Sequence, residues 1–289
     1  MVLQEYVEFN RRLGNKVRWL DEVPFCEYRR MFYWSVPRHR EYQLTATRLR
    51  SLLYRGAMGA IGMTGVESTR LTGILMSDGP GYGLGRIRPK KRSQVRRGLE
   101  HCEVRRVPWK DMRALGLPLN REALLRQGRA SGVRLGDAAW WAQQCDISAE
   151  FSDVCAWGAY VNGELASYVH VIFHDVASTT GDRDRIADVV HFMSGDKHLS
   201  SYPNEALIFQ VSRELLESGR CRRVCFGSAS NVPGLLHWKL QMGYRLQPIG
   251  YSVVANPLLK AAKFFSPKLR LWLDGNPRVG RDSQPQDAT

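Results

Sequence analysis

Apolar and polar positions alternate most clearly between residues 154 and 173. Two strand-like runs, Val154–Val161 and Glu164–Phe173, are separated only by Asn162-Gly163. A tight type I′ turn needs positive φ at both central residues, and Asn followed by Gly meets that need at low cost. The pattern therefore predicts an antiparallel hairpin, which the apolar run 187–193 follows as a further strand.

A helical period follows this strand. Leu207, Val211 and Leu215 recur every four residues between about Asn204 and Ser218, which predicts one amphipathic helix. By the same criteria, further strands are predicted at 57–66, 70–76, 82–87, 102–107 and 222–226, with a strand pair at 244–254. Further helices are predicted at 42–54, 91–99, 109–115 and 121–129, from 137, and from 233 to 242.

From residue 102 the predicted order is strand, two helices, hairpin, strand, helix, strand, helix, strand. Strands that alternate with helices after an antiparallel hairpin indicate an α/β fold with a mixed central sheet. The 289 residues, 44% hydrophobic, can bury a full core. We expect an N-terminal α+β extension over 1–101, the main domain over 102–255, a C-terminal amphipathic helix over 256–274 and a disordered tail over 275–289.

This order resembles the GNAT acyltransferase fold. Five short segments are similar to the branch that contains FemA/FemX-like aminoacyl transferases and BioF2-like acetyltransferases: 92–97, 162–166, 202–204, 224–228 and 237–243. The resemblance implies transfer of an acyl or aminoacyl group to an amine acceptor, with acyl-CoA or aminoacyl-tRNA as donor and no metal. It also implies that Lys239 meets the reacting acyl–donor junction. The alternative for Lys239 is an exposed helix lysine.

One loop departs from the GNAT pattern. Typical acetyl-CoA users carry a Gln/Arg-x-x-Gly-x-Gly/Ala loop, whose amides at a helix N-terminus hold the pyrophosphate. Residues 197–203 contain no glycine, and Pro203 lacks an amide proton. The departure argues against a standard CoA site and favours aminoacyl-tRNA or another activated donor. Donor contacts are expected at Ser200, Ser201 and Asn204, where the alternative is plain N-capping.

Tyr168, His170 and His174 share strand parity, so all three could face one side of the sheet. A histidine that titrates near neutrality can take a proton from the attacking amine. Tyr168 and His170 therefore join Lys239 as catalytic candidates. The alternative for each is a surface residue or a satisfied core residue.

The net charge of +14 is concentrated, because nine basic and two acidic residues lie between Arg86 and Arg106. Such density indicates a phosphate-bearing partner such as tRNA, for which the candidate contacts are Lys91, Arg92, Arg96 and Arg97. A solvated basic surface is the alternative. A second function class follows, in which a catalytically inactive GNAT-like domain binds nucleic acid through this basic segment.

The cellular setting is predicted from absences. No secretory signal or 20-residue apolar stretch is found, so we expect a cytoplasmic protein that does not span a membrane. Its six cysteines form no C-x-x-C pair and are expected as reduced core thiols without a metal. The segment Leu258–Leu273 combines aromatic and basic residues and could lie on an anionic membrane. Pro267 interrupts it, which favours a packed helix.

Overall fold

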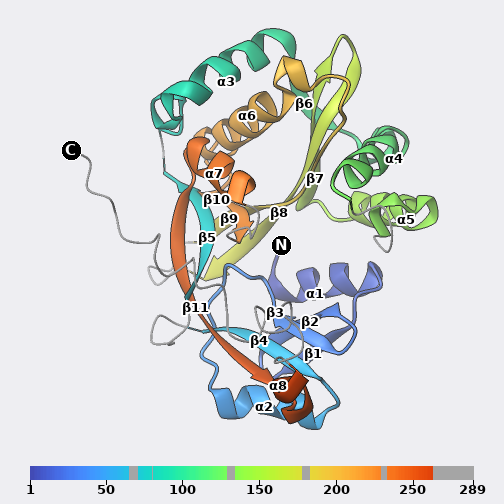
Figure 1. Cartoon of the computed structure of the whole chain (residues 1–289), viewed down its shortest axis with the longest axis vertical. Coiled ribbons are helices and arrows are strands. Elements are labelled where there is room, and N and C mark those ends of the chain that lie inside the picture. Colours follow the sequence, from blue (N-terminus) through green and yellow to red (C-terminus); the bar gives the residue numbers. More distant parts are fainter. Residues whose placement is uncertain (65–70, 80, 129–133, 178–182, 229–232, 263–289) are drawn as a thin grey trace. The chain divides into compact units, whose positions relative to one another are not determined.

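The computed structural model describes residues 1–64, 71–79, 81–128, 134–177, 183–228 and 233–262 (Figure 1). The chain forms two compact units that exchange segments. The first unit comprises Met1–Leu13, Met76–Phe226 and His237–Arg245, and the second comprises Gly14–Leu75, Gly227–Leu236 and Leu246–Thr289. Strand β5 (Leu71–Asp78) carries the chain from the second unit into the first, and β11 (Arg245–Ala255) carries it back.

The first unit is built on a mixed sheet. Its strands are β6 (Glu103–Val107), β7 (Val154–Val161), β8 (Glu164–Ala177), β9 (Arg183–Ser194) and β10 (Arg223–Ser228), in the spatial order β10-β9-β8-β7-β6. Neighbours are antiparallel except β9 and β10, which are parallel. The predicted hairpin is confirmed: β7 pairs with β8 around Asn162 and Gly163, whose φ angles are 50° and 81°.

Helices cover both faces of this sheet (Figure 1). They are α1 (Leu3–Arg12), α3 (Pro89–His101), α4 (Trp109–Arg126), α5 (Ala138–Ala149), α6 (Pro203–Glu217) and α7 (Pro233–Gln241). Helices α4 and α5 pack a core against one face, in which Trp141, Tyr160 and Tyr168 are buried. Helices α3 and α6 lie on the opposite face and touch closely, because a Cβ on Gly98 would come within 2.6 Å of the Tyr202 carbonyl oxygen.

Three predicted elements are wrong in this part of the chain. The helices expected at 109–115 and 121–129 are one helix, α4, which continues through Pro118 because residues before and after it, including Met112 and Leu124, are buried in one core. A strand was expected at 82–87, but Leu84–Arg86 is a 3₁₀ turn. The strand pair expected at 244–254 is the single strand β11, which continues without a break through Pro248.

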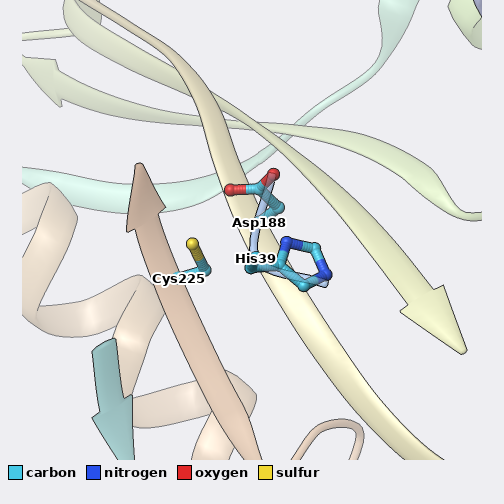
Figure 2. A group of neighbouring side chains, drawn as sticks. All are labelled: His39, Asp188 and Cys225. Atoms are coloured by element: carbon cyan, nitrogen blue, oxygen red, sulfur yellow. The ribbon is translucent and has the colours of Figure 1, made fainter. Parts of the chain in front are cut away.

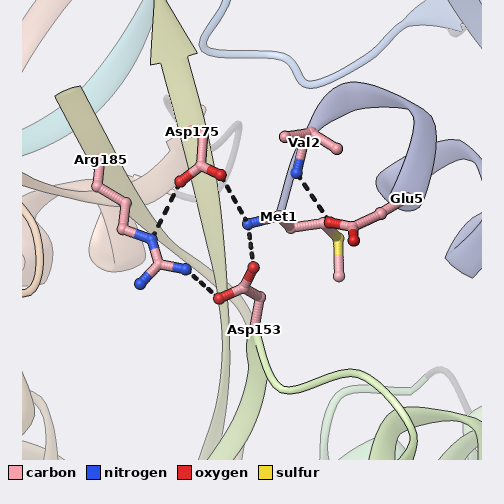
Figure 3. Close-up of polar contacts among 6 residues, drawn as sticks. All are labelled: Met1, Val2, Glu5, Asp153, Asp175 and Arg185. Atoms are coloured by element: carbon pink, nitrogen blue, oxygen red, sulfur yellow. Dashed lines mark hydrogen bonds and ion pairs between the residues drawn. The ribbon is translucent and has the colours of Figure 1, made fainter. Parts of the chain in front are cut away.

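A cluster of charges joins α1 to the sheet within the first unit (Figure 3). The Met1 amino group pairs with the carboxylates of Asp153 and Asp175, the latter at 3.4 Å. Arg185 of β9 pairs with the same two carboxylates, at 3.2 Å for Asp175. Each carboxylate is thus shared by two cations in a partly buried setting, which offsets the cost of removing it from water.

The second unit has its own sheet and core. Strands β1 (Val17–Leu20), β2 (Val23–Arg29), β3 (Phe32–Ser35), β4 (Gly59–Thr64) and β11 lie in that order. Helix α2 (Ala46–Tyr54) packs Leu49 and Leu52 against Phe25 and Tyr33. It begins at 46, later than predicted, because the Thr45 hydroxyl accepts a hydrogen bond from the Arg48 amide and caps it.

Helix α8 (Pro257–Ala262) follows β11. The rest of the predicted C-terminal helix and the predicted tail lie outside the described residues. Within the described part of the chain, no helix combines the length and the apolar character needed to cross a bilayer.

Candidate functional site

Strands β9 and β10 pair over only three positions. Arg223–Cys225 align with Ile186–Asp188, although β9 continues to Ser194 and β10 to Ser228. Beyond this short ladder the two strands are held by side chains. Phe192 of β9 stacks on Trp238 of α7 at 5.7 Å, and Phe226 of β10 packs edge-on to both, at 5.8 and 6.0 Å. The result is an apolar, aromatic environment at the point where parallel pairing ends.

Lys239 is held in this environment. It follows Trp238 on α7, and only 7% of it is exposed. Its Nζ donates to the Phe226 carbonyl oxygen at 2.6 Å and lies 4.3 Å from the centre of the Phe226 ring. Burial lowers the pKa of Lys239 to about 8, against an ordinary value of 10.5, while the neighbouring Cys225 and Asp188 act in the opposite direction. Lys239 is therefore a buried cation whose charge is easily lost, unlike an exposed helix lysine.

Asp188 and Cys225 occupy paired positions of β9 and β10 (Figure 2). Paired residues of neighbouring strands share a face of the sheet, so the carboxylate and the thiol lie side by side, and both favour the charged form of Lys239. Asp188 was not among the predicted site residues, and Cys225 was predicted as a reduced core thiol. A signal was present, since Asp188 is the one charged residue in the apolar run Ile186–Phe192, apart from a histidine.

The pairing of β8 with β9 contains a bulge next to these residues. His170 pairs with His191 and Val171 with Val189, so Val190 is an extra residue in β9. A bulge reverses the alternation of faces beyond it. Because of it, Phe192 lies with the α7 aromatic rings on one face, while Asp188 lies on the other face with His174.

The start of α6 is acidic and hydrogen-bonded. Glu205, in the first turn, is 8% exposed. One of its carboxylate oxygens accepts from Lys91 Nζ at 2.7 Å and from Trp238 Nε1 at 2.9 Å. Pro203 is the first helical residue and offers no amide. A carboxylate and a proline in the first turn suit a diphosphate poorly, since the bound anion needs free amides and positive charge there.

The three predicted donor contacts lie around the same turn. Ser200 is exposed in the 3₁₀ turn Leu199–Ser201, and the Ser201 carbonyl accepts from Cys102 Sγ at 3.5 Å. The Asn204 side chain donates to Ser194 Oγ at 3.3 Å. The preceding loop is fixed by acidic groups as well, because Glu122 accepts from the Asp196 amide at 2.6 Å.

Tyr168 and His170 come together one strand away, on β8. Their rings are 5.1 Å apart, and Trp109, Trp141 and His191 also surround His170. His170 is 2% exposed, and burial together with His191 holds its pKa well below the ordinary range. It is therefore a neutral imidazole at physiological pH. The predicted parity is confirmed, since His174 lies on the same face, 3.9 Å from Asp188 and in ring contact with Tyr6.

The four predicted phosphate contacts divide into two pairs. Lys91 donates a hydrogen bond to Glu205, and Arg92 donates to the Ile87 and Gly85 carbonyls at 2.7 and 3.1 Å. Arg96 and Arg97 are exposed on α3. On β6, Arg105 and Arg106 are also exposed and lie over the rings of Tyr160 and Trp157, at 3.9 and 5.0 Å. The exposed charge of the basic segment is thus on Arg88, Lys90, Arg96, Arg97 and β6, where Arg105 also pairs with Glu103 at 3.1 Å.

Strand order, hairpin, bulge and parallel β9–β10 pair together define a mixed α/β sheet of GNAT type. No family model matches the chain, and no curated protein matches it. Among solved structures, FemX is similar over 90% of this chain and 93% of that chain, with a TM-score of 0.60 and 12% identity. The DUF2156 C-terminal domain of a lysylphosphatidylglycerol synthetase from Agrobacterium fabrum covers 90% of both chains at 0.60 and 11%. At these identities the likeness shows a FemX-like GNAT fold.

Proposed function

We propose that the protein is an N-acyltransferase that moves an acyl or aminoacyl group from an activated donor to an amine. One observation carries the proposal: a buried lysine points its ammonium at the place where β9 and β10 of a GNAT-type sheet stop pairing. A buried cation without an anionic partner destabilises the fold, so its presence points to a function. Lys239 has one backbone carbonyl as its hydrogen-bond acceptor and lies in an aromatic environment.

The chemistry suits this position. The amine nitrogen attacks the acyl carbonyl carbon, negative charge develops on the carbonyl oxygen, and the bond to the leaving oxygen or sulfur then breaks. A fixed cation in an apolar environment stabilises that charge far better than one in water. Because its pKa is about 8, the Lys239 ammonium is also acidic enough to protonate an alkoxide leaving group, and the neutral lysine can then accept the proton that the attacking nitrogen loses.

Of the two donor types, the geometry favours an aminoacyl ester on tRNA over acyl-CoA. The first turn of α6 carries Glu205 and Pro203 where a CoA diphosphate would need free amides. The exposed arginines of α3, in contrast, suit a long polyanion. In this proposal Arg96 and Arg97 contact phosphates of the donor, and Lys239 acts at the ester.

The test is a transfer assay with radiolabelled donors, acetyl-CoA and aminoacyl-tRNA, against a panel of amine acceptors. We expect label to reach the amine fraction, and Lys239→Met to lower turnover by a factor on the order of 10²–10³. Lys110→Met is the matched control, since Lys110 is exposed on α4 and should leave turnover unchanged. Equal turnover in the Lys239 variant and the wild type would overturn the proposed site.

A second function remains supported by one observation, the exposure of Arg96, Arg97, Arg105 and Arg106 on neighbouring elements. An inactive GNAT-like domain that binds nucleic acid would use the same surface. It predicts steeply salt-dependent tRNA binding without transfer from either donor. Product formation that depends on Lys239 excludes it.

A further inference from the structure

The hairpin of β2 and β3 in the second unit presents aromatic rings on the sheet face opposite α2. Cys26 pairs with Trp34, and Phe25 pairs with Ser35. Phe25 and Tyr33 are buried in the core under α2. Trp34, at the alternate position, therefore faces away from α2. Tyr28 lies at the irregularity between Glu27 and Arg29, and 51% of it is exposed.

The rings form a layered arrangement with arginines. Tyr28 stacks on Trp34 with ring centres 5.1 Å apart and planes within 15°. The Arg38 guanidinium lies 3.9 Å from the centre of the Trp34 ring and 5.5 Å from that of Tyr28. Arg29 lies 5.7 Å from the Tyr28 ring. A flat, partly exposed ring supported by a second ring and flanked by guanidinium groups is a surface on which another planar group can stack.

The charges within the segment that carries these rings are of one sign. The segment from Tyr28 to Arg40 contains four arginines and no acidic residue. Two acids flank the segment: Glu41 is exposed, and Glu27 accepts from the Met31 amide at 2.7 Å and so holds the hairpin turn. The partner that fits is therefore both planar and anionic. A lipid surface fits less well, because the turn places Arg29 and Arg30, both exposed, beside Met31 where an inserted apolar tip would be needed.

We propose that this hairpin is a binding surface for unpaired nucleotides of a single-stranded RNA. A base stacks on the exposed ring of Tyr28, while Arg29 and Arg30, both exposed at the turn, contact the adjacent phosphates. Stacking on aromatic rings combined with a positively charged track is how proteins bind single strands without sequence preference. The surface belongs to the second unit, so this inference does not rest on acyl transfer or on Lys239.

The test is the fluorescence anisotropy of a labelled 12-nucleotide RNA without secondary structure, titrated with the full chain. We expect Tyr28→Ala to weaken binding about 5- to 100-fold, the usual effect of losing one stacking ring. Tyr28→Phe keeps the ring and should bind within about twofold of the wild type. Tyr54→Ala is the matched control, because Tyr54 is 90% exposed on α2 of the same unit, and it should have no effect.

Two further measurements separate this surface from other sites. The same loss on Tyr28→Ala is expected in an Arg96→Gln, Arg97→Gln background, which removes two of the exposed cations of α3. A 12-base-pair duplex should bind more weakly than the single strand, because its bases are already stacked. Wild-type affinity in Tyr28→Ala, a duplex bound as tightly as the single strand, or binding only to anionic vesicles would overturn the proposal.

Discussion

Replacing Lys239 by Met should make the protein more stable at neutral pH and inactive. Burial lowers the pKa of Lys239 from 10.5 to about 8, and each factor of ten in acidity is worth about 1.4 kcal/mol. Holding the charge at pH 7 therefore costs about 3 kcal/mol relative to the unfolded chain. Met keeps most of the volume but leaves the Phe226 carbonyl without its donor, a loss of about 1–2 kcal/mol. The net expectation is a gain of about 1–2 kcal/mol at pH 7.

The sign reverses at high pH. Between about pH 8 and 10.5 the unfolded chain binds more protons at Lys239 than the folded chain, so the wild type gains stability as the pH rises through this window. The Met variant lacks that gain and should be less stable than the wild type by about 1 kcal/mol near pH 10. Urea unfolding of both proteins at pH 7 and 9.5 measures the difference in their free energies of unfolding. The titration of the buried tyrosines and cysteines is common to both proteins and cancels in this difference. A difference that does not change with pH would refute the reasoning.

Three other substitutions test the packing around the site, each by urea unfolding. Gly98→Ala should destabilise the fold by about 1–3 kcal/mol, because the new methyl group meets the backbone at the start of α6; an unchanged midpoint would mean that α3 does not pack there. Tyr168→Phe should cost about 1–3 kcal/mol by leaving a buried amide oxygen without a donor. Lys91→Met should lower the free energy of unfolding by about 3–5 kcal/mol, because the buried Glu205 carboxylate loses its cationic partner. Arg96→Met is the control and should change it by less than about 0.5 kcal/mol.

Features with a local cause were predictable from the sequence. The hairpin turn depends on two adjacent residues, Asn162 and Gly163, and α6 on a four-residue period within one segment, so the turn and α6 were both placed to within about a residue. Strand β8 nevertheless runs on to Ala177, past the predicted end at Phe173. Helix α4 was divided at Pro118 because local preference opposes proline in a helix, while the core that holds α4 together comes from strands distant in sequence. The first 37 residues were left unassigned, since their strands are short and gain their order from one another.

The candidate site was predictable only in part. Lys239 was found through a resemblance, but nothing along α7 indicates that its side chain is buried. The neighbourhood of Asp188 and Cys225 depends on the register of two parallel strands that are joined through α6, which no local pattern reveals. The sequence predicted one continuous basic surface. Lys91 and Arg92 are instead engaged in hydrogen bonds, Lys91 with Glu205 of α6 and Arg92 with the Ile87 carbonyl, and neither partner could be predicted from the local sequence.

The exchange of segments between the two units has a consequence for the newly made chain. The first thirteen residues belong to the first unit, the next 62 to the second, and both units receive further segments after residue 226. During synthesis, therefore, the first unit cannot close before Arg245 has left the ribosome, nor the second before the rest of β11 has followed. A fragment that starts at residue 102 would lack α1, α3 and the pairing of Met1 with Asp153. We expect such fragments to aggregate, and the full chain to fold late and as a whole, at a rate limited by its many non-local contacts.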